Sequence, residues 1–131
     1  MQWDASGKAG FTRGEPWLPI DNAAAANVAV QDGEPGSILA LYRRLLSLRR
    51  GDPALVAGSI ENVIAQGHVL TFERCLGSVR LFVALNMQAR PGAIKLPAGR
   101  VVLSTREGLD EYRVVGELIL DSDEGIVVVC D

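Results

Sequence analysis

The densest group of carboxylates in the sequence is the run Asp121-Ser122-Asp123-Glu124, which Gly125 follows. Closely spaced carboxylate oxygens are the ligands that Ca²⁺ takes in proteins. The run does not match the twelve-residue calcium loop, which ends in a bidentate Glu after a central glycine. We therefore interpret it as a hairpin turn with solvated acids, and we predict no metal site.

The sequence also lacks the residues that a nucleophilic catalytic triad or a phosphate-binding loop requires. His68 is the single histidine, and the sequence contains no Gly-x-Ser-x-Gly elbow. Gly7-Lys8-Ala9-Gly10 has neither the spacing of a phosphate-binding loop nor a helix pattern after it. We predict that His68 begins a strand without a catalytic role, and that the chain holds no cofactor.

The two cysteines, Cys75 and Cys130, lie far apart in strand-like runs. They can pair if their strands are neighbours; otherwise they are reduced thiols acting as small apolar residues, as expected of a cytoplasmic protein. With one histidine they lack the clustered spacing of a zinc site. Polar Gln2 and Asp4 follow Met1 in place of a basic and apolar leader, and no run of about 18 apolar residues occurs. We expect a cytoplasmic chain with no membrane partner.

Length and charge exclude two further classes of protein. The chain has 131 residues with 48% hydrophobic content, enough for one core. A closed barrel of eight β/α repeats needs roughly 250 residues. The net charge of −3 gives no electrostatic basis for binding a polyanion, so nucleic acid is not an expected partner.

The elements that must position any site begin with a long irregular segment. Glycine and proline interrupt residues 1–36, although the alanine-rich stretch from Asn22 to Ala29 allows a short helix. From Ser37 to Arg50 the apolar residues follow the three-and-four spacing of an amphipathic helix with a wide buried stripe. Ser37 is the expected N-cap, Gly51 and Pro53 end the helix, and the arginines form a solvated face.

The remainder of the chain has the pattern of an antiparallel β-sandwich. Short apolar runs separated by turn residues predict seven strands, at Ser59–Ala65, His68–Cys75, Val79–Met87, Ala93–Leu96, Arg100–Ser104, Glu117–Leu120 and Gly125–Cys130. Apolar residues on both faces of Val79–Met87 indicate a central strand that is covered on both sides. The predicted fold is mainly β, with one α-helix before the sandwich.

Several of these segments together resemble the α-amylase superfamily (glycoside hydrolase family 13), in its α-glucosidase and oligo-1,6-glucosidase branch. The resemblance rests on ordered motifs: Met1-Gln2-Trp3-Asp4 running to Phe11, Pro16-Trp17-Leu18-Pro19, Ser37-Ile38-Leu39 with Tyr42-Arg43, Pro53-Ala54-Leu55, and more weakly Leu81 to Asn86. It implies that residues 1–53 are the end of a catalytic barrel, and that 54–131 are a Greek-key-like C-terminal sandwich. The two parts are expected to form one compact unit.

The resemblance also assigns the chemistry of the parent enzyme to residues outside this chain. Retaining glycoside hydrolysis needs two carboxyl groups about 5 Å apart, and the family's segments that carry these acids have no counterpart in this sequence. We therefore predict no catalytic residue here. Gln2 and Trp3 match a loop near the substrate mouth of the family, so they are candidates for contact with sugar in the intact parent.

Three functions remain open at this stage. The first is a non-catalytic C-terminal region of an α-glucosidase-like hydrolase, whose partner is its own missing barrel and which meets oligosaccharide only through that parent. The second is an autonomous carbohydrate-binding sandwich that uses Trp3 or Trp17, since rigid aromatic rings cover sugar faces at low entropic cost. The third is a structural module that forms a homodimer through exposed apolar surface.

Overall fold

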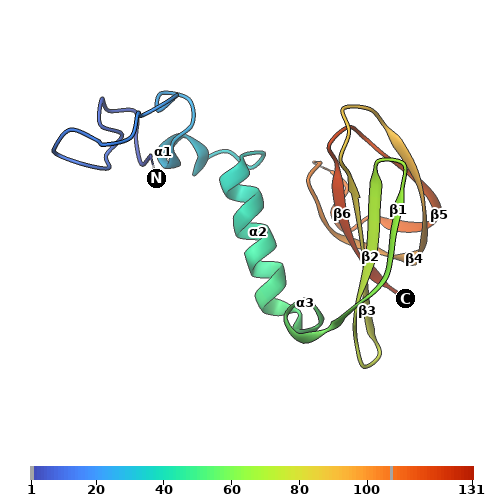
Figure 1. Cartoon of the computed structure of the whole chain (residues 1–131). Coiled ribbons are helices and arrows are strands. Elements are labelled where there is room, and N and C mark those ends of the chain that lie inside the picture. Colours follow the sequence, from blue (N-terminus) through green and yellow to red (C-terminus); the bar gives the residue numbers. More distant parts are fainter. Residues whose placement is uncertain (1, 107) are drawn as a thin grey trace. The chain divides into compact units, whose positions relative to one another are not determined.

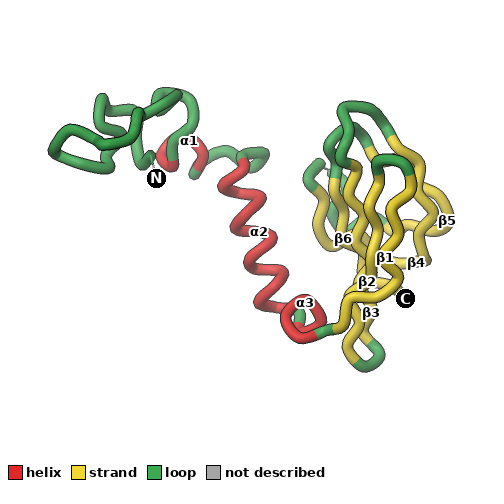
Figure 2. The backbone as a smooth tube through the Cα atoms, viewed as in Figure 1, coloured by secondary structure: helices red, strands yellow, loops and turns green. Residues whose placement is uncertain are grey.

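The computed structural model of the chain describes residues 2–106 and 108–131 (Figure 1). Met1, which opens the Met-Gln-Trp-Asp motif, lies outside the described residues. Contacts within the chain define two compact units, one that extends to Arg44 and one from Leu45 to Asp131. Loops dominate the first unit and strands the second (Figure 2). The domain boundary that the resemblance places after residue 53 stays a prediction.

The N-terminal unit is held by backbone and capping hydrogen bonds. Trp3 N donates to Ala9 O at 2.7 Å, while Gln2 O and Trp3 O accept from Val28 N and Ala29 N at 3.1 and 3.0 Å. These bonds tie the start of the chain to α1 (Val28–Gln31), whose N-cap is Asn27. Of the short helix expected between Asn22 and Ala29, only Val28 and Ala29 are helical, in α1, and the described residues before α1 are irregular.

The predicted amphipathic helix is α2, Ile38–Gly51. Ser37 caps it, because its Oγ accepts from Ala40 N at 3.1 Å. Pro53 does not only stop α2: it opens a further short helix, α3 (Pro53–Ala57), whose N-cap Asp52 accepts from Ala54 N. The prediction of one helix thus missed α3, because a proline at a first helical position was interpreted only as a stop signal.

The six strands of the C-terminal unit form one antiparallel sheet in the order β1-β2-β3-β6-β4-β5. The bounds are Ser59–Gln66 for β1, Val69–Leu76 for β2, Val79–Asn86 for β3, Gly92–Ser104 for β4, Arg113–Leu120 for β5 and Gly125–Cys130 for β6. The two strands predicted at Ala93–Leu96 and Arg100–Ser104 are one strand, β4. It continues because Pro97 and Gly99 lie at register shifts and not at a turn.

The sheet curls over itself and encloses the core in a sandwich-like manner. Strand β4 pairs with β5 through residues 92–100 and with β6 through residues 99–104, so it takes part in both halves of the fold. The core joins side chains from strands that are distant in the sheet order, among them Val69, Phe82, Ile94, Val114 and Leu120. The predicted antiparallel sandwich is confirmed, with its layers connected by hydrogen bonds.

Strand β3 is the central strand that the sequence predicted. Phe82 and Ala84 lie in the core, and Leu81 and Val83 on its other face are also buried. Glycine is required where β4 passes β6, because a Cβ on Gly99 would lie 2.3 Å from Val129 O. Among the described residues, no helix is long and apolar enough to cross a membrane.

Candidate functional site

The two predicted substrate-proximal residues, Gln2 and Trp3, lie in the N-terminal loop. Gln2 is half-buried, and its Nε2 donates to Asp21 O at 2.7 Å. Its Oε1 is buried and has no hydrogen-bond partner among the described residues. The neighbouring Trp3 has its backbone fixed on both sides and its side chain 51% exposed. The loop therefore presents an indole ring on a fixed backbone.

A tight turn after Trp3 keeps this loop in shape. The Asp4 carboxylate accepts from Ser6 N at 2.9 Å, and hydrogen bonds from the Ser6 side chain and backbone hold the pKa of Asp4 below its usual range. Gly10 has a φ of +61°, and a Cβ there would lie 2.5 Å from the Asp4 carboxylate. The turn thus depends on a side-chain acceptor at position 4 and on glycine at position 10.

Large aromatic and apolar side chains of the N-terminal unit are exposed. Trp17, between Pro16 and Pro19, is 85% exposed, and Phe11 and Leu18 are both 56% exposed. Side chains of this size and apolar character gain stability when a surface covers them, and among the described residues these three stay exposed. Exposed flat rings suit sugar stacking or burial against another domain equally well.

Helix α2 corrects one prediction. Its apolar stripe was expected to be buried, yet none of its residues is buried, and Ile38, Tyr42, Leu45 and Leu46 are between 38% and 69% exposed. The spacing predicted which residues form the stripe, but spacing carries no information on whether a covering surface is in the same chain. On the polar face Arg43 forms an exposed ion pair with Asp32.

The acidic run Asp121–Glu124 is the turn that joins β5 to β6. It is not the predicted hairpin, because β5 and β6 do not pair and β4 lies between them, and its acids are not all solvated. Glu124 is only 3% exposed. Its Oε2 accepts from Asp121 N at 2.6 Å, and its Oε1 accepts from Ser104 Oγ at 3.3 Å. The interpretation as solvated acids is therefore wrong for Glu124, because the side chain folds back onto its own turn.

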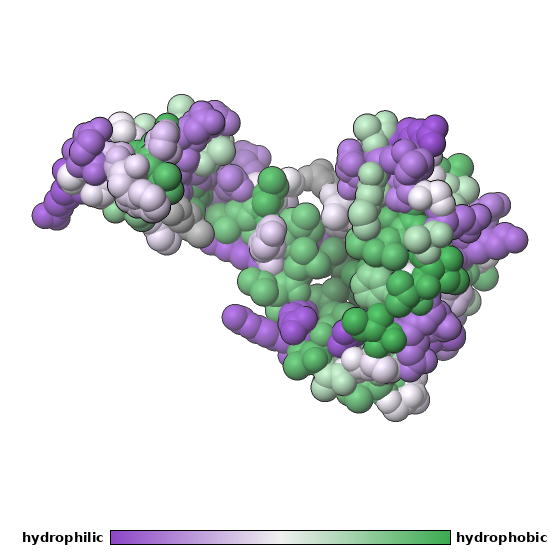
Figure 3. Space-filling view, viewed as in Figure 1, coloured by the Kyte–Doolittle hydropathy of each residue, from purple (hydrophilic) through white to green (hydrophobic). Residues whose placement is uncertain are grey.

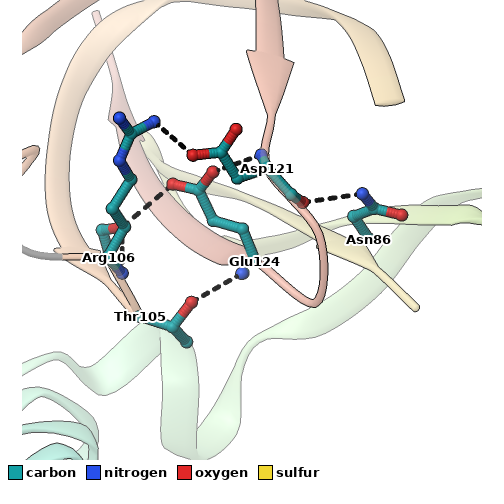
Figure 4. A network of polar contacts seen from close by, with 7 residues as sticks. Asn86, Thr105, Arg106, Asp121 and Glu124 are labelled. Carbon is teal, nitrogen blue, oxygen red and sulfur yellow. Dashed lines mark hydrogen bonds and ion pairs between the residues drawn. The ribbon is translucent and has the colours of Figure 1, made fainter. Parts of the chain in front are cut away.

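Neighbouring side chains extend this buried carboxylate into a polar network (Figure 4). Asn86 Nδ2 donates to Asp121 O at 2.7 Å, Gly125 N donates to Thr105 Oγ1 at 3.0 Å, and Arg106 pairs with Asp121 at 2.7 Å. An open hollow of about 380 Å³ lies over the network. Within the described residues, no group of three or more His, Cys, Asp or Glu side chains could hold a metal ion.

The two cysteines do not pair. Both are free, and β3 lies between their strands, with Arg80 opposite Cys75 and next in register to Cys130. Burial raises the pKa of both thiols, which are therefore poor nucleophiles. Thus the alternative of reduced thiols describes the structure, and the disulfide alternative is wrong.

One pair of acidic residues was not predicted from the sequence. Glu61 on β1 lies directly opposite Glu73 on β2. Like charges in such positions repel, and here Asn62 Nδ2 donates to Glu73 at 2.9 Å while Arg80 approaches it at 4.0 Å. Only the strand register brings the two acids together, so no local motif could have revealed them. Their partners indicate a structural role.

A family model matches the N-terminal part of the chain, and known relatives match most of it. Residues 1–58 match the family model "Alpha amylase, catalytic domain". The chain is 37% identical over 120 residues to a probable alpha-glucosidase of Rhizobium meliloti, a match that covers 91% of this chain and 21% of that protein. It is 31% identical over 109 residues to the oligo-1,6-glucosidase of Parageobacillus thermoglucosidasius, covering 82% and 19%. The chain thus spans about a fifth of the length of these relatives.

Solved structures agree with these matches. The isomaltulose synthase of Klebsiella sp. LX3 superposes with a TM-score of 0.88 at 29% identity, covering 98% of this chain and 24% of the synthase. The trehalulose synthase MutB of Pseudomonas mesoacidophila MX-45 gives the same values. The chain belongs to the α-amylase family, glycoside hydrolase family 13. Within that family it corresponds to the C-terminal region of the α-glucosidases and oligo-1,6-glucosidases, namely the end of the catalytic barrel and the β-domain that follows.

Proposed function

We propose that this chain is the non-catalytic C-terminal part of a retaining α-glucosidase-like hydrolase, which acts on α-glucosidic bonds of malto- or isomalto-oligosaccharides. The sheet then serves to stabilise the barrel. The observation that carries the proposal is the exposed apolar stripe of α2, within a segment that matches a catalytic domain. An amphipathic helix of this kind gains its stability from a surface that covers it.

The placement of acids supports the absence of catalysis in the chain itself. Glu124 is buried and bonded within its turn, and Glu73 is bonded to Asn62 and faces Arg80. A retaining mechanism needs an accessible nucleophile beside an acid with a raised pKa. Neither acidic group offers such a pair in a hollow that could enclose a sugar.

A turnover assay tests this part of the proposal. The purified chain is incubated with maltose, isomaltose and nitrophenyl α-glucoside, and we expect glucose or nitrophenol release no faster than in buffer. Turnover that one carboxylate substitution abolishes would refute the proposal. A contaminating glucosidase is recognised because its activity does not follow the substitution.

For Gln2 and Trp3 we propose a place beside the substrate in the intact enzyme, supported by the exposed ring of Trp3 and the unpartnered Oε1 of Gln2. In a chimera that carries this chain in place of the matching region of the Rhizobium protein, Trp3→Ala should raise KM by several-fold with kcat less changed. Phe11→Ala is the control, because Phe11 is similarly exposed. An equal effect of both substitutions would contradict the assignment.

The carbohydrate-binding alternative retains one observation in its favour, the 85% exposure of Trp17. Titration with maltooligosaccharides, followed by tryptophan fluorescence, separates it from the main proposal. Binding that Trp17→Ala removes would favour the autonomous module, whereas an unchanged spectrum would exclude it. Sedimentation at several concentrations tests the homodimer in the same way.

The cellular setting that we propose is the cytoplasm, in carbohydrate metabolism. Two free thiols are consistent with a reducing compartment. Fractionation of cells that express the intact parent would test this, and recovery outside the cell would contradict it.

A further inference from the structure

The segment that joins α1 to α2 contains the single Asp-Gly pair of the sequence, Asp32-Gly33. In such a pair the amide nitrogen of the glycine can attack the carboxyl carbon of the aspartate side chain, because the glycine has no Cβ to obstruct the approach. The Asp32 side chain is 56% exposed, and a Cβ on Gly33 would meet no atom within 4 Å. Hydrophilic side chains cover much of the N-terminal unit in the space-filling view (Figure 3, purple). Both reacting groups are therefore open to water.

The backbone conformation holds the two reacting atoms apart, although the attacking nitrogen is available. Gly33 N donates to no other described residue, whereas Asp32 N donates to Val28 O at 2.8 Å as the C-cap of α1. The cap gives Asp32 a helical φ of −65° and ψ of −30°. A five-membered ring closes only when Asp32 Cβ eclipses Gly33 N about the Cα–C bond, which a helical ψ prevents. The cap therefore slows ring closure.

An ion pair with α2 restrains the carboxylate as well. Arg43 Nη1 donates to Asp32 Oδ1, and this charge-assisted bond lies within the N-terminal unit. Ring closure expels one carboxyl oxygen as water, so an oxygen that the guanidinium holds must first be released. The pair with Arg43 therefore opposes the same step as the helical cap.

We propose that Asp32 is a site of isoaspartate formation in this chain, and that the α1 cap and Arg43 restrain the reaction. In the first step a bond forms between Gly33 N and Asp32 Cγ, the amide proton is lost, and one carboxyl oxygen leaves as water. Water then adds to the resulting succinimide. Opening at Cγ restores aspartate, whereas opening at the main-chain carbon gives isoaspartate, whose backbone runs through the former side chain. The reaction needs no oxidant and no co-reactant besides water.

The product alters the N-terminal unit without a change in mass. Isoaspartate adds one methylene to the main chain at the end of α1 and displaces the carboxylate, so the pair with Arg43 is lost. Because α1 holds the start of the chain through Val28 N and Ala29 N, the change reaches the loop that carries Trp3. This chemistry is independent of the function proposed above, since it involves only residues of this segment.

The test is storage of the full chain in neutral buffer at physiological temperature for several weeks. Isoaspartate is labelled with an isoaspartyl carboxyl methyltransferase, and mass spectrometry locates the labelled peptide. We expect the label on the peptide that contains Asp32. Gly33→Ala introduces no clash, and it should lower the label about tenfold or more, because its Cβ obstructs the attacking nitrogen.

Variants of α2 separate the restraint from the site. Arg43→Gln should accumulate isoaspartate about two- to fivefold faster, the range that the energy of an exposed ion pair allows. The matched control is Arg50→Gln, which removes an exposed arginine from the same helix and should stay within about 1.5-fold of the unaltered chain. In urea that unfolds the chain, Arg43→Gln and the unaltered chain should react equally fast, because the restraint is absent there.

Each result decides one part of the proposal. A label that spreads over other aspartates, or that Gly33→Ala does not lower, would overturn the assignment of the site. Equal rates for folded Arg43→Gln and the unaltered chain, or an equal acceleration by Arg50→Gln, would overturn the role of Arg43. Circular dichroism verifies that each variant is folded. If Arg43→Gln does not fold, high salt, which screens the exposed pair, replaces it and should accelerate the reaction of the unaltered chain.

Discussion

Replacement of Glu124 by alanine should destabilise the C-terminal unit strongly. The carboxylate is 3% exposed and accepts a short bond from Asp121 N at 2.6 Å and a longer one from Ser104 Oγ at 3.3 Å. Hydrogen bonds to charged groups contribute about 1.5 to 3 kcal/mol each, and removal of the acceptor leaves buried donors unpaired. One strong and one weak bond together give an expected loss of about 2 to 4 kcal/mol in the free energy of unfolding.

Urea unfolding followed by circular dichroism measures this loss, and thermal melting should show a fall of about 10 to 20 °C in Tm. The control is Asp123→Asn in the same turn: Asp123 is exposed with a φ of +54°, which asparagine tolerates. The control should stay within about 0.5 kcal/mol of the unaltered chain. A loss below about 1 kcal/mol for Glu124→Ala, or equal losses for both variants, would refute the structural role of the buried carboxylate.

Three other predictions concern single features. The pKa of Asp4 is lowered in the folded loop, so the stabilisation of the turn by its carboxylate should be complete above the ordinary pKa of an aspartate and should be lost as pH falls through the lowered pKa. Ser6→Ala should move the pKa of Asp4 upward, as NMR titration would measure. Gly99→Ala places a Cβ 2.3 Å from a backbone oxygen and should cost about 3 kcal/mol or more in urea unfolding, whereas Gly51→Ala, with no atom within 4 Å, should cost nothing measurable. The two thiols should alkylate more slowly than free cysteine at pH 8 and form no intramolecular disulfide in air, as mass spectrometry would detect.

Patterns in the sequence predicted the elements whose signals are local. The alternation of side chains predicted β3 and its two buried faces. The three-and-four spacing of apolar residues, together with the N-cap Ser37, predicted α2 to within one residue at each end. What the patterns missed depends on contacts between distant residues. Two segments predicted as separate strands form the single strand β4. They do so in a sheet where β6 lies between β3 and β4 and where Gly99 packs closely on Val129.

The same limit applies to the candidate site. The family resemblance identified Gln2 and Trp3 as candidate site residues. The unpartnered Oε1 of Gln2 and the fixed backbone of Trp3 are properties of the folded loop, which the sequence does not show. The acidic run was recognised as a turn, yet the burial of Glu124 depends on Ser104, which lies 20 residues earlier in the sequence. Composition alone would assign that carboxylate to solvent.

The distribution of buried apolar surface gives an energetic reason for the proposed partnership. The core cluster is built entirely from the strands β2 to β6, whereas α2 has no buried residue. Full burial of a Leu or Ile side chain contributes roughly 1.5 to 3 kcal/mol, so a surface that covers Ile38, Leu45 and Leu46 would add several kcal/mol that the chain alone does not have. Because α3 is fixed to the sheet by Arg74 and follows α2 after one residue, Asp52, the sheet anchors one end of the exposed helix. The stability of the sheet would then be transmitted to a barrel that packs on α2.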